Sequence, residues 1–293
     1  MIGRAARRPI RRSPSLSARP RNDPGDYAFA LTQGSRSFPR MAKDSAQNRA
    51  LATIAVYSLK GGVGKTTFAI NLAWASACIS KRRTLLWDLD PQAASSWLLS
   101  TDHSSRDAAQ AIFSKDVEVR KLIQPSTVPG LDLIAADTSL RGLDHLFREM
   151  DKKKRLARLI ETLGRDYDRI ILDCPPGLTE TSEQVLRAAD IIVIPVIPSP
   201  LSQRAMGEVA RYLVQRGGAH APILPVYSMV DRRRSLHRAA LESQTGWPAI
   251  PMASTVEQMT VRRKPLGAFA PNSPPAQAFS TLWTQVERQL SAR

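Results

Sequence analysis

Short apolar runs alternate with helical patterns along most of the chain. The runs are continuous rather than alternating, which is typical of strands that are buried on both faces of a sheet. They predict strands at residues 52–57, 83–88, 131–136, 169–173, 189–196 and 223–231. Apolar residues at helical spacing predict helices at residues 65–77, 107–112, 117–123, 144–163, 202–214 and 275–290. Strands that alternate with helices predict an α/β fold, a three-layer, doubly wound and mostly parallel sheet.

The composition is that of a globular chain with a substantial core. The chain has 293 residues, of which 43% are hydrophobic, and it can therefore fold as one large α/β domain or two small ones. No apolar run approaches the roughly 20 residues that span a bilayer. The cysteines, Cys78 and Cys174, lie in apolar helix and strand segments, which favours buried free thiols in a reducing, cytoplasmic compartment.

A glycine-rich segment lies between the first predicted strand and the first predicted helix. Its glycines let consecutive backbone N–H groups curl around an anion at a helix N-terminus, where the helix dipole also favours phosphate. Lys65 is placed to contact the β- and γ-phosphates, and the Thr66 hydroxyl is placed to bind Mg²⁺. The segment therefore predicts binding of a nucleoside triphosphate by Lys60, Gly61, Gly62, Val63, Gly64, Lys65, Thr66 and Thr67.

Two further predicted strands end in carboxylates. Asp88 ends the strand at 83–88 and Asp90 stands two residues further on, while Asp173 ends the strand at 169–173. The carboxyl ends of parallel strands form the ligand edge of such a sheet. Asp173 has the Walker B arrangement, which holds a Mg²⁺-bound water beside the phosphate loop. For Asp88 and Asp90 the alternative is a pair of capping residues before a helix.

The phosphate-loop sequence departs from the ordinary pattern at its start. Leu59 stands where that pattern has glycine, and a second lysine, Lys60, follows it. This form resembles the deviant Walker A motif of the ParA/MinD family, and the segments 88–92 and 173–176 are similar to that family's D-x-D-P-Q and D-x-P-P motifs. The resemblance spans roughly residues 50–291 and implies a P-loop NTPase fold of the SIMIBI type. It is nearest to the small ParA type, since no N-terminal helix-turn-helix domain is evident.

The resemblance also implies a function and roles for single residues. It implies an ATPase with ATP and Mg²⁺ as cofactors, slow intrinsic turnover and an ATP-dependent sandwich dimer, in which Lys60 reaches the partner's nucleotide. Asp90 would orient the attacking water and Asp88 would support the Mg²⁺ shell. Asp231 lies in a segment similar to the family's x-M-x-D-x-R-x-x-L near the adenine pocket, so it would read the base or brace that loop.

The first forty residues form a basic arm. They contain nine arginines, no lysine and two acids, and they lack the apolar periodicity needed to offset the entropy of ordering. We expect residues 1–48 to be disordered and residues 49–293 to form the ATPase domain. Three interpretations of the arm remain open: a segment that adds affinity for nucleic acid, a sequence that resembles a transit peptide, or an extension upstream of a true start at Met41.

The whole chain has a net charge of +16, and a second group of arginines lies in its folded part. Seven arginines fall between residues 204 and 238 against two acids, Glu208 and Asp231. In ParA-like proteins a basic surface in this region holds duplex DNA without reading its sequence, and phosphate contacts need only charge and reach. A solvated or partner-facing patch is the alternative. The candidate DNA-binding residues are Arg204, Arg211, Arg232, Arg233, Arg234 and Arg238.

The predicted function is therefore a nucleoid-associated, ParA-like ATPase that segregates DNA or positions a protein cargo when a ParB-like partner stimulates hydrolysis. The alternative is a MinD-like or cellulose-synthesis-associated ATPase that acts at the membrane. MinD relatives end in a basic amphipathic helix, whereas this tail has only Arg288 and Arg293 beside Glu287. A reductase of the nitrogenase iron-protein type would need cysteines in loops that face the dimer axis, and neither cysteine is placed there.

Overall fold

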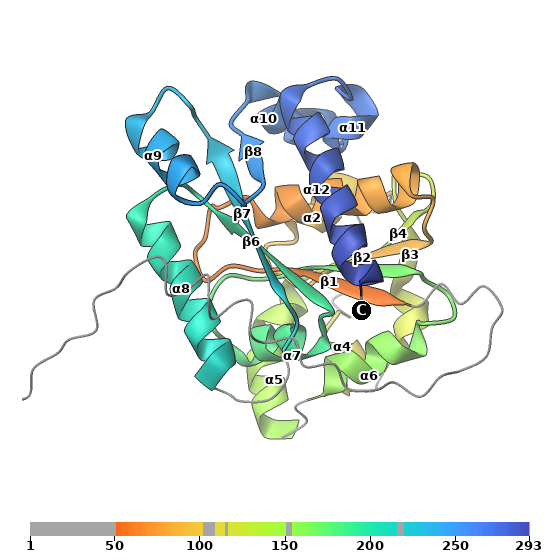
Figure 1. Cartoon of the computed structure of the whole chain (residues 1–293). Helices are drawn as coiled ribbons and strands as arrows, with labels where there is room; N and C mark the ends of the chain where they lie inside the picture. The colour runs from red at the N-terminus through yellow and green to blue at the C-terminus, as the bar shows by residue number, and fades with distance from the viewer. Residues whose placement is uncertain (1–50, 102–108, 115–116, 151–153, 216–219, 293) are drawn as a thin grey trace, which may run out of the picture.

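The computed structural model describes residues 51–101, 109–114, 117–150, 154–215 and 220–292 (Figure 1). The basic arm predicted at residues 1–48 lies outside these ranges. A sheet of eight strands runs through the molecule in the order β3-β4-β2-β5-β1-β6-β7-β8. The strands are β1 Ala52–Val56, β2 Thr84–Asp88, β3 Ile123–Pro125, β4 Leu131–Ile134, β5 Arg169–Asp173, β6 Ile191–Val196, β7 Ile223–Val230 and β8 Ala249–Pro251. All neighbours pair in parallel except β3 and β4.

The central strands are buried along their whole length. Every residue of β1, β2, β5 and β6 is buried, as continuous apolar runs predict for a sheet covered on both faces. The parallel register places Asp173 beside both Val56 and Asp88. The last residues of three adjacent strands therefore lie at one level, and the predicted ligand edge is formed.

Helices cover both faces of the sheet, which confirms the predicted doubly wound architecture. Figure 1 shows α2, α11 and α12 together on one side and α5 to α8 on the other. Their apolar residues form two clusters, and the edge-to-face contact of Phe68 with Phe279, at 5.0 Å between ring centroids, joins α2 to α12. The helices are α2 Lys65–Trp74, α3 Ala94–Leu99, α4 Ala111–Ser114, α5 Leu143–Met150, α6 Arg155–Thr162, α7 Glu180–Ala188, α8 Pro200–Gln215, α9 Ser235–Ser243, α10 Ser254–Arg262, α11 Leu266–Phe269 and α12 Pro274–Ser291.

Several sequence-based boundaries differ from the structure. The single helix predicted at 144–163 is wrong, because Lys154 has a non-helical backbone and α6 begins after it; lysine and arginine favour helices, which hides this break in the sequence. The short helix predicted at 117–123 is a 3₁₀ turn at Val119–Leu122 that leads into β3. The sequence analysis missed α7, α9, β3 and β8, and the two strands are only three residues long.

The C-terminal helix follows its prediction. Phe279, Leu282, Trp283 and Val286 of α12 are buried, so the apolar face of this helix packs into the core. None of the described helices has the length and apolar character needed to cross a bilayer. Both cysteines are free thiols, with Cys174 buried and Cys78 partly exposed.

Candidate functional site

The glycine-rich loop between β1 and α2 forms a cradle of main-chain groups. Gly62 and Gly64 have positive φ angles of 72° and 94°, which glycine adopts without strain. Gly64 is also the residue before α2, so the cradle opens at a helix N-terminus. The Ser228 hydroxyl of β7 donates to the Val63 carbonyl at 2.8 Å and fixes the loop from the side.

Lys65 lies over this cradle. Its ammonium is 3.4 Å from the Lys60 carbonyl, and the residue is buried at 8% exposure. Burial lowers the pKa of Lys65, an effect that the nearby carboxylates Asp173 and Asp90 oppose. A buried ammonium at the mouth of a ring of backbone donors favours a ligand with several negative charges.

Asp173 reaches the same place from β5, on the α2 face of the sheet. Its Oδ2 accepts a hydrogen bond of 2.6 Å from the Ser95 hydroxyl, whereas its buried Oδ1 has no hydrogen-bond partner among the described residues. Burial raises the pKa of Asp173, and the hydroxyls of Ser95 and Thr66 partly offset that rise. An unsatisfied buried carboxylate oxygen is costly, and together with the Thr66 hydroxyl it forms the donor set that Mg²⁺ prefers. These residues therefore fit a magnesium site.

Asp88 lies beside Asp173, but protein donors occupy both of its oxygens. Oδ1 accepts from the Asp90 backbone N–H at 3.1 Å, and Oδ2 accepts from the backbone and hydroxyl of Ser96 at 2.9 and 2.7 Å. Burial, and then the charge of Asp173, raises the pKa of Asp88. Asp88 thus braces the turn from β2 into α3.

Asp90 and Lys60 are the two other predicted catalytic residues, one in the turn after β2 and one in the glycine-rich loop. Asp90 is half-buried, and its Oδ1 accepts from the Gln92 backbone N–H at 2.9 Å. Its charge acts on both Lys65 and Asp173, which places Asp90 close to the phosphate site. Within the described ranges the Lys60 ammonium forms no hydrogen bond or ion pair, so this cation is available to a further anion.

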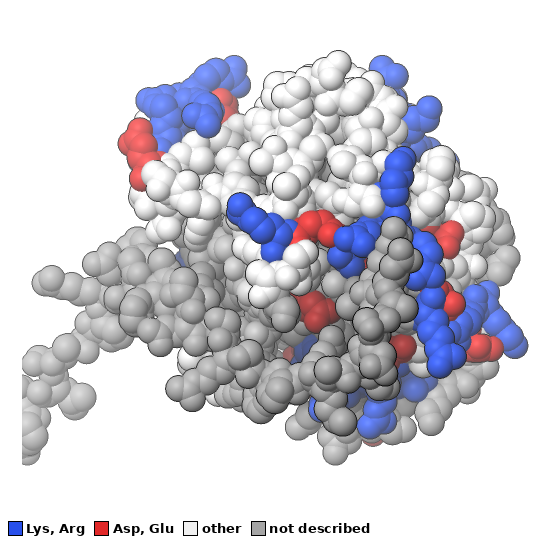
Figure 2. All heavy atoms as spheres, turned by 45° about the vertical axis from the view of Figure 1, so that its right-hand side comes forward, with Lys and Arg blue, Asp and Glu red and all other residues white. Residues whose placement is uncertain are grey.

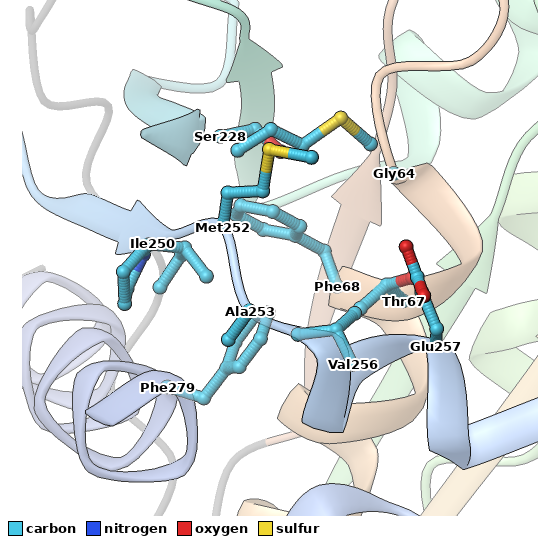
Figure 3. Close-up of a pocket in the computed structure, with 12 residues that line it drawn as sticks. Gly64, Thr67, Phe68, Ser228, Ile250, Met252, Ala253, Val256, Glu257 and Phe279 are labelled. Carbon is cyan, nitrogen blue, oxygen red and sulfur yellow. The ribbon is translucent and has the colours of Figure 1, made fainter. Parts of the chain in front are cut away.

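A cavity of about 110 Å³ opens beside the loop (Figure 3). Its wall is almost entirely apolar, and two of its side chains are methionines, Met229 and Met252. Met229 has a positive φ of 55°, an uncommon conformation for a residue with a side chain. The sequence analysis did not find this cavity, since its residues come from four separate segments. The lining residues are Gly64, Thr67, Phe68, Ser228, Met229, Ile250, Pro251, Met252, Ala253, Val256, Glu257 and Phe279.

Asp231 follows β7 and is not among the residues that line this cavity. Both of its oxygens accept from the Arg233 guanidinium at 3.0 Å, and this hydrogen bonding lowers the pKa of Asp231 to about 2. Its backbone N–H donates to Nδ1 of the buried His237 at 3.0 Å. These contacts favour the bracing role of the two that the sequence left open.

The six candidate DNA-binding arginines are all exposed. Two come from α8, where Arg204 pairs with Glu208 at 3.2 Å, and four come from the turn before α9 and from α9 itself. The Tyr227 hydroxyl lies between these elements, with Gln203 of α8 at 3.4 Å and the Ala240 carbonyl of α9 at 3.0 Å. Figure 2 shows basic side chains gathered over the end of the molecule where Figure 1 places α9.

Comparison with known sequences identifies relatives that are 38–39% identical to this chain over about half of its length. Residues 51–215 match a family model described as an AAA domain. The sporulation initiation inhibitor protein Soj of Bacillus subtilis is 39% identical over 147 residues, which are 49% of this chain and 57% of Soj. The chromosome partitioning protein ParA of Myxococcus xanthus is 38% identical over 146 residues, 49% of this chain and 51% of that protein. The chain thus spans about half the length of these two relatives.

Solved structures resemble the fold over a longer stretch. Cobyrinic acid a,c-diamide synthase from Mycobacterium smegmatis, solved with an ATP analogue and magnesium, has a TM-score of 0.71 at 25% identity, covering 83% of this chain and 97% of its own. The septum site-determining protein MinD of Pyrococcus horikoshii, solved with Mg-ADP, has a TM-score of 0.64 at 22% identity, covering 81% of this chain and 96% of its own. Because the family model covers more than half of the sequence, and its relatives by sequence and by fold are ParA-like and MinD-like proteins, this chain belongs to the ParA/MinD family of P-loop ATPases.

Proposed function

We propose that this protein binds ATP together with Mg²⁺ at the phosphate loop and hydrolyses it slowly. The observation that carries the proposal is the unpaired, buried Oδ1 of Asp173 beside the Lys65 ammonium. Thr66 and Asp173 would hold the Mg²⁺, and Asp88 would support them by bracing the turn after β2. When bound, the cation neutralises charge on the phosphates.

The chain's own groups supply the remaining chemistry. The loop amides from Gly61 to Thr67 hold the phosphates in place, and Lys65 stabilises the charge that develops on them during hydrolysis. Asp90 orients the attacking water from the edge of the site. The apolar cavity beside Gly64 and Thr67 has the position and character to receive the base.

The second part of the proposal is that ATP controls association. The Lys60 ammonium has no partner within the described residues, and we propose that it contacts the nucleotide of a second copy in a sandwich dimer. Contacts that exist only with the triphosphate favour the dimer, and hydrolysis removes them.

The dimer would present the six arginines to duplex DNA, and a ParB-like or adaptor partner would stimulate hydrolysis. Exposed arginines on α8 and around α9 can contact phosphates without reading bases. The apolar face of α12 is buried in the core, which favours DNA over the membrane as the surface that the protein binds. The cargo could be a chromosome, a plasmid or a protein assembly.

Association is the property that tests this proposal most directly. Light scattering after gel filtration, with a non-hydrolysable ATP analogue and Mg²⁺, should show a dimer for the unmodified protein and single copies with ADP. Lys60→Ala should bind the analogue and remain a single copy, while Lys121→Ala, which removes an exposed lysine from the 3₁₀ turn before β3, should dimerise normally. Single copies of the unmodified protein with the analogue, or a normal dimer of Lys60→Ala, would contradict the proposal.

Sedimentation with plasmid DNA or with anionic vesicles distinguishes the two proposed binding partners, duplex DNA and the membrane. The analogue-bound protein should sediment with DNA, and the logarithm of its affinity should fall with the logarithm of salt concentration at about −0.9 per phosphate contact. The double variant Arg232→Ala with Arg234→Ala should bind more weakly and reduce that slope, whereas Arg165→Ala, which removes an exposed arginine from the turn between α6 and β5, should change neither. A flat salt response, or sedimentation with vesicles alone, would count against DNA.

A further inference from the structure

Tyr57 is a large residue at a place where the fold has little room. It directly follows β1 and precedes the phosphate loop, and it is completely buried. Its backbone N–H donates to the Val193 carbonyl of β6 at 3.0 Å, so its main chain still belongs to the sheet. Its side chain packs in the cluster that α5 to α8 cover, on the face opposite to α2.

The Tyr57 hydroxyl crosses to another loop. It donates to the Gly177 carbonyl at 2.9 Å, and the Ser182 hydroxyl of α7 also lies within its reach. Burial raises the pKa of Tyr57 to about 12, so this group stays a neutral donor at physiological pH. The hydrogen bond joins residues 120 positions apart in the sequence.

The loop that receives this hydrogen bond starts at the magnesium site. It runs from Cys174, next to Asp173, to Thr179, whose side chain caps α7 in a reciprocal capping box with Ser182. Pro175 and Pro176 restrict its backbone, and Gly177 turns it with a positive φ of 97°. The loop is therefore fixed at each end by regular structure and at its turn by Tyr57.

We propose that Tyr57 is a positioning residue for hydrolysis, holding the loop of residues 174–179 in the conformation that keeps Asp173 and its neighbours aligned with the bound phosphates. This inference rests on the proposed ATPase function. The phosphate loop and the loop after Asp173 approach the nucleotide from two adjacent strands, and the Tyr57 hydroxyl is a direct link between them. Binding of nucleotide should depend mainly on the phosphate loop, whereas the chemical step should depend on this link.

Tyr57→Phe removes the link and keeps the ring in the core. We expect kcat for ATP hydrolysis to fall about five- to tenfold, the usual effect of one lost hydrogen bond. The dissociation constant for ATP should stay within about twofold, because the groups that bind the phosphates are unchanged. Amide hydrogen exchange of Thr179, whose N–H donates to the Ser182 hydroxyl at 2.8 Å, should become at least about fivefold faster without nucleotide.

Two further variants complete the test. Tyr167→Phe removes the hydroxyl of a buried tyrosine before β5, which donates to Asp132 of β4 at 2.7 Å, and it should leave kcat and the exchange of the Thr179 amide unchanged. Gly177→Ala disturbs the same loop through its positive φ rather than through crowding, since the nearest atom to an added Cβ would lie at 3.7 Å. It should reproduce the loss of kcat, and it replaces Tyr57→Phe if that variant fails to fold.

The possible outcomes separate the two proposals. If the unmodified protein hydrolyses ATP and Tyr57→Phe matches it in kcat, or if the Thr179 amide exchanges at the same rate in both, the positioning role is wrong. If the unmodified protein does not hydrolyse ATP at all, the proposed function fails first. The exchange experiment then still reports whether Tyr57 holds the loop.

Discussion

Two buried aspartates flank strand β5, and they use their oxygens in different ways. Asp168, just before the strand, accepts from the backbone and the guanidinium of Arg83, both at 3.0 Å. Asp173, the last residue of the strand, keeps one buried oxygen without a partner among the described residues. Both side chains are almost fully enclosed. The carboxylate at the start of β5 therefore has its hydrogen bonds satisfied within the protein, whereas the carboxylate at its end keeps one unsatisfied oxygen.

The same contrast extends to the neighbouring charges. At the start of β5, Arg169 pairs with Glu287 of α12 at 2.7 Å, and Arg82 reaches the same carboxylate at 3.1 Å. At its end, Lys65 and the carboxylates of Asp88, Asp90 and Asp173 crowd together around the phosphate loop. Paired charges stabilise the first region. Desolvated charges without full partners destabilise the second, which is typical of a binding site.

The largest expected effect is on activity at the site end. Asp173→Asn should lower Mg²⁺-dependent ATP hydrolysis by at least about 100-fold, because the amide is a poor ligand for the cation. The free energy of unfolding without nucleotide should stay the same or rise, since the substitution removes a desolvated charge. Phosphate release and urea unfolding measure the two quantities. A large loss of stability would show that Asp173 has the same role as Asp168.

The next effect is on stability at the other end. Asp168→Asn should lower the free energy of unfolding by about 2 kcal/mol. It weakens the hydrogen bonds that Asp168 accepts from the backbone N–H and from the charged guanidinium of Arg83. The half-exposed Arg83 side chain limits this loss. Steady-state ATP hydrolysis by the folded variant should stay within about twofold of the unmodified protein. A much larger fall in activity would mean that the two ends are coupled through β5.

A smaller effect is on the pH dependence of stability, and its sign should differ between the two ends. Burial raises the folded-state pKa of Asp173, so its contribution is present at low pH and is lost as pH rises from about 4 through the raised value. For Glu287, burial opposes the shift, but hydrogen bonds and charges from Arg169 and Arg82 lower the pKa. Its contribution is therefore present above about pH 4.3 and is lost as pH falls through the lowered value.

Unfolding without nucleotide between pH 3 and pH 8 measures both contributions. In the unmodified protein the buried charge of Asp173 should lower the free energy of unfolding on the order of 1 kcal/mol at the upper end of this range, and Asp173→Asn should abolish this loss. The charge of Glu287 should raise the free energy of unfolding by a smaller amount, because its carboxylate is partly exposed. Glu287→Gln should abolish this gain. Parallel pH profiles for the two variants would contradict the difference between the ends of β5.

The sequence predicted the ligand edge better than it predicted the contacts within it. Continuous apolar runs predicted β1, β2 and β5. The glycine-rich segment after β1 identified Lys65, and the carboxylate that ends β5 identified Asp173, since each of these signals lies within a few consecutive residues. The occupied oxygens of Asp88 depend on Ser96 in α3, and the link from Tyr57 to Gly177 spans two strands. Such contacts arise only from the packed fold. The edge strands β3 and β8 were missed because three residues are too few to show a period.

The alignment of Val56, Asp88 and Asp173 across three neighbouring strands limits how this protein can change over time. One residue inserted into β5 would turn Asp173 to the opposite face of the sheet, away from the phosphate loop. An insertion or a deletion in an inner strand should therefore disrupt the site as much as a substitution of the residue at its end. Gains and losses of residues among its descendants should collect around β3, whose residues line neither the magnesium site nor the cavity beside the phosphate loop.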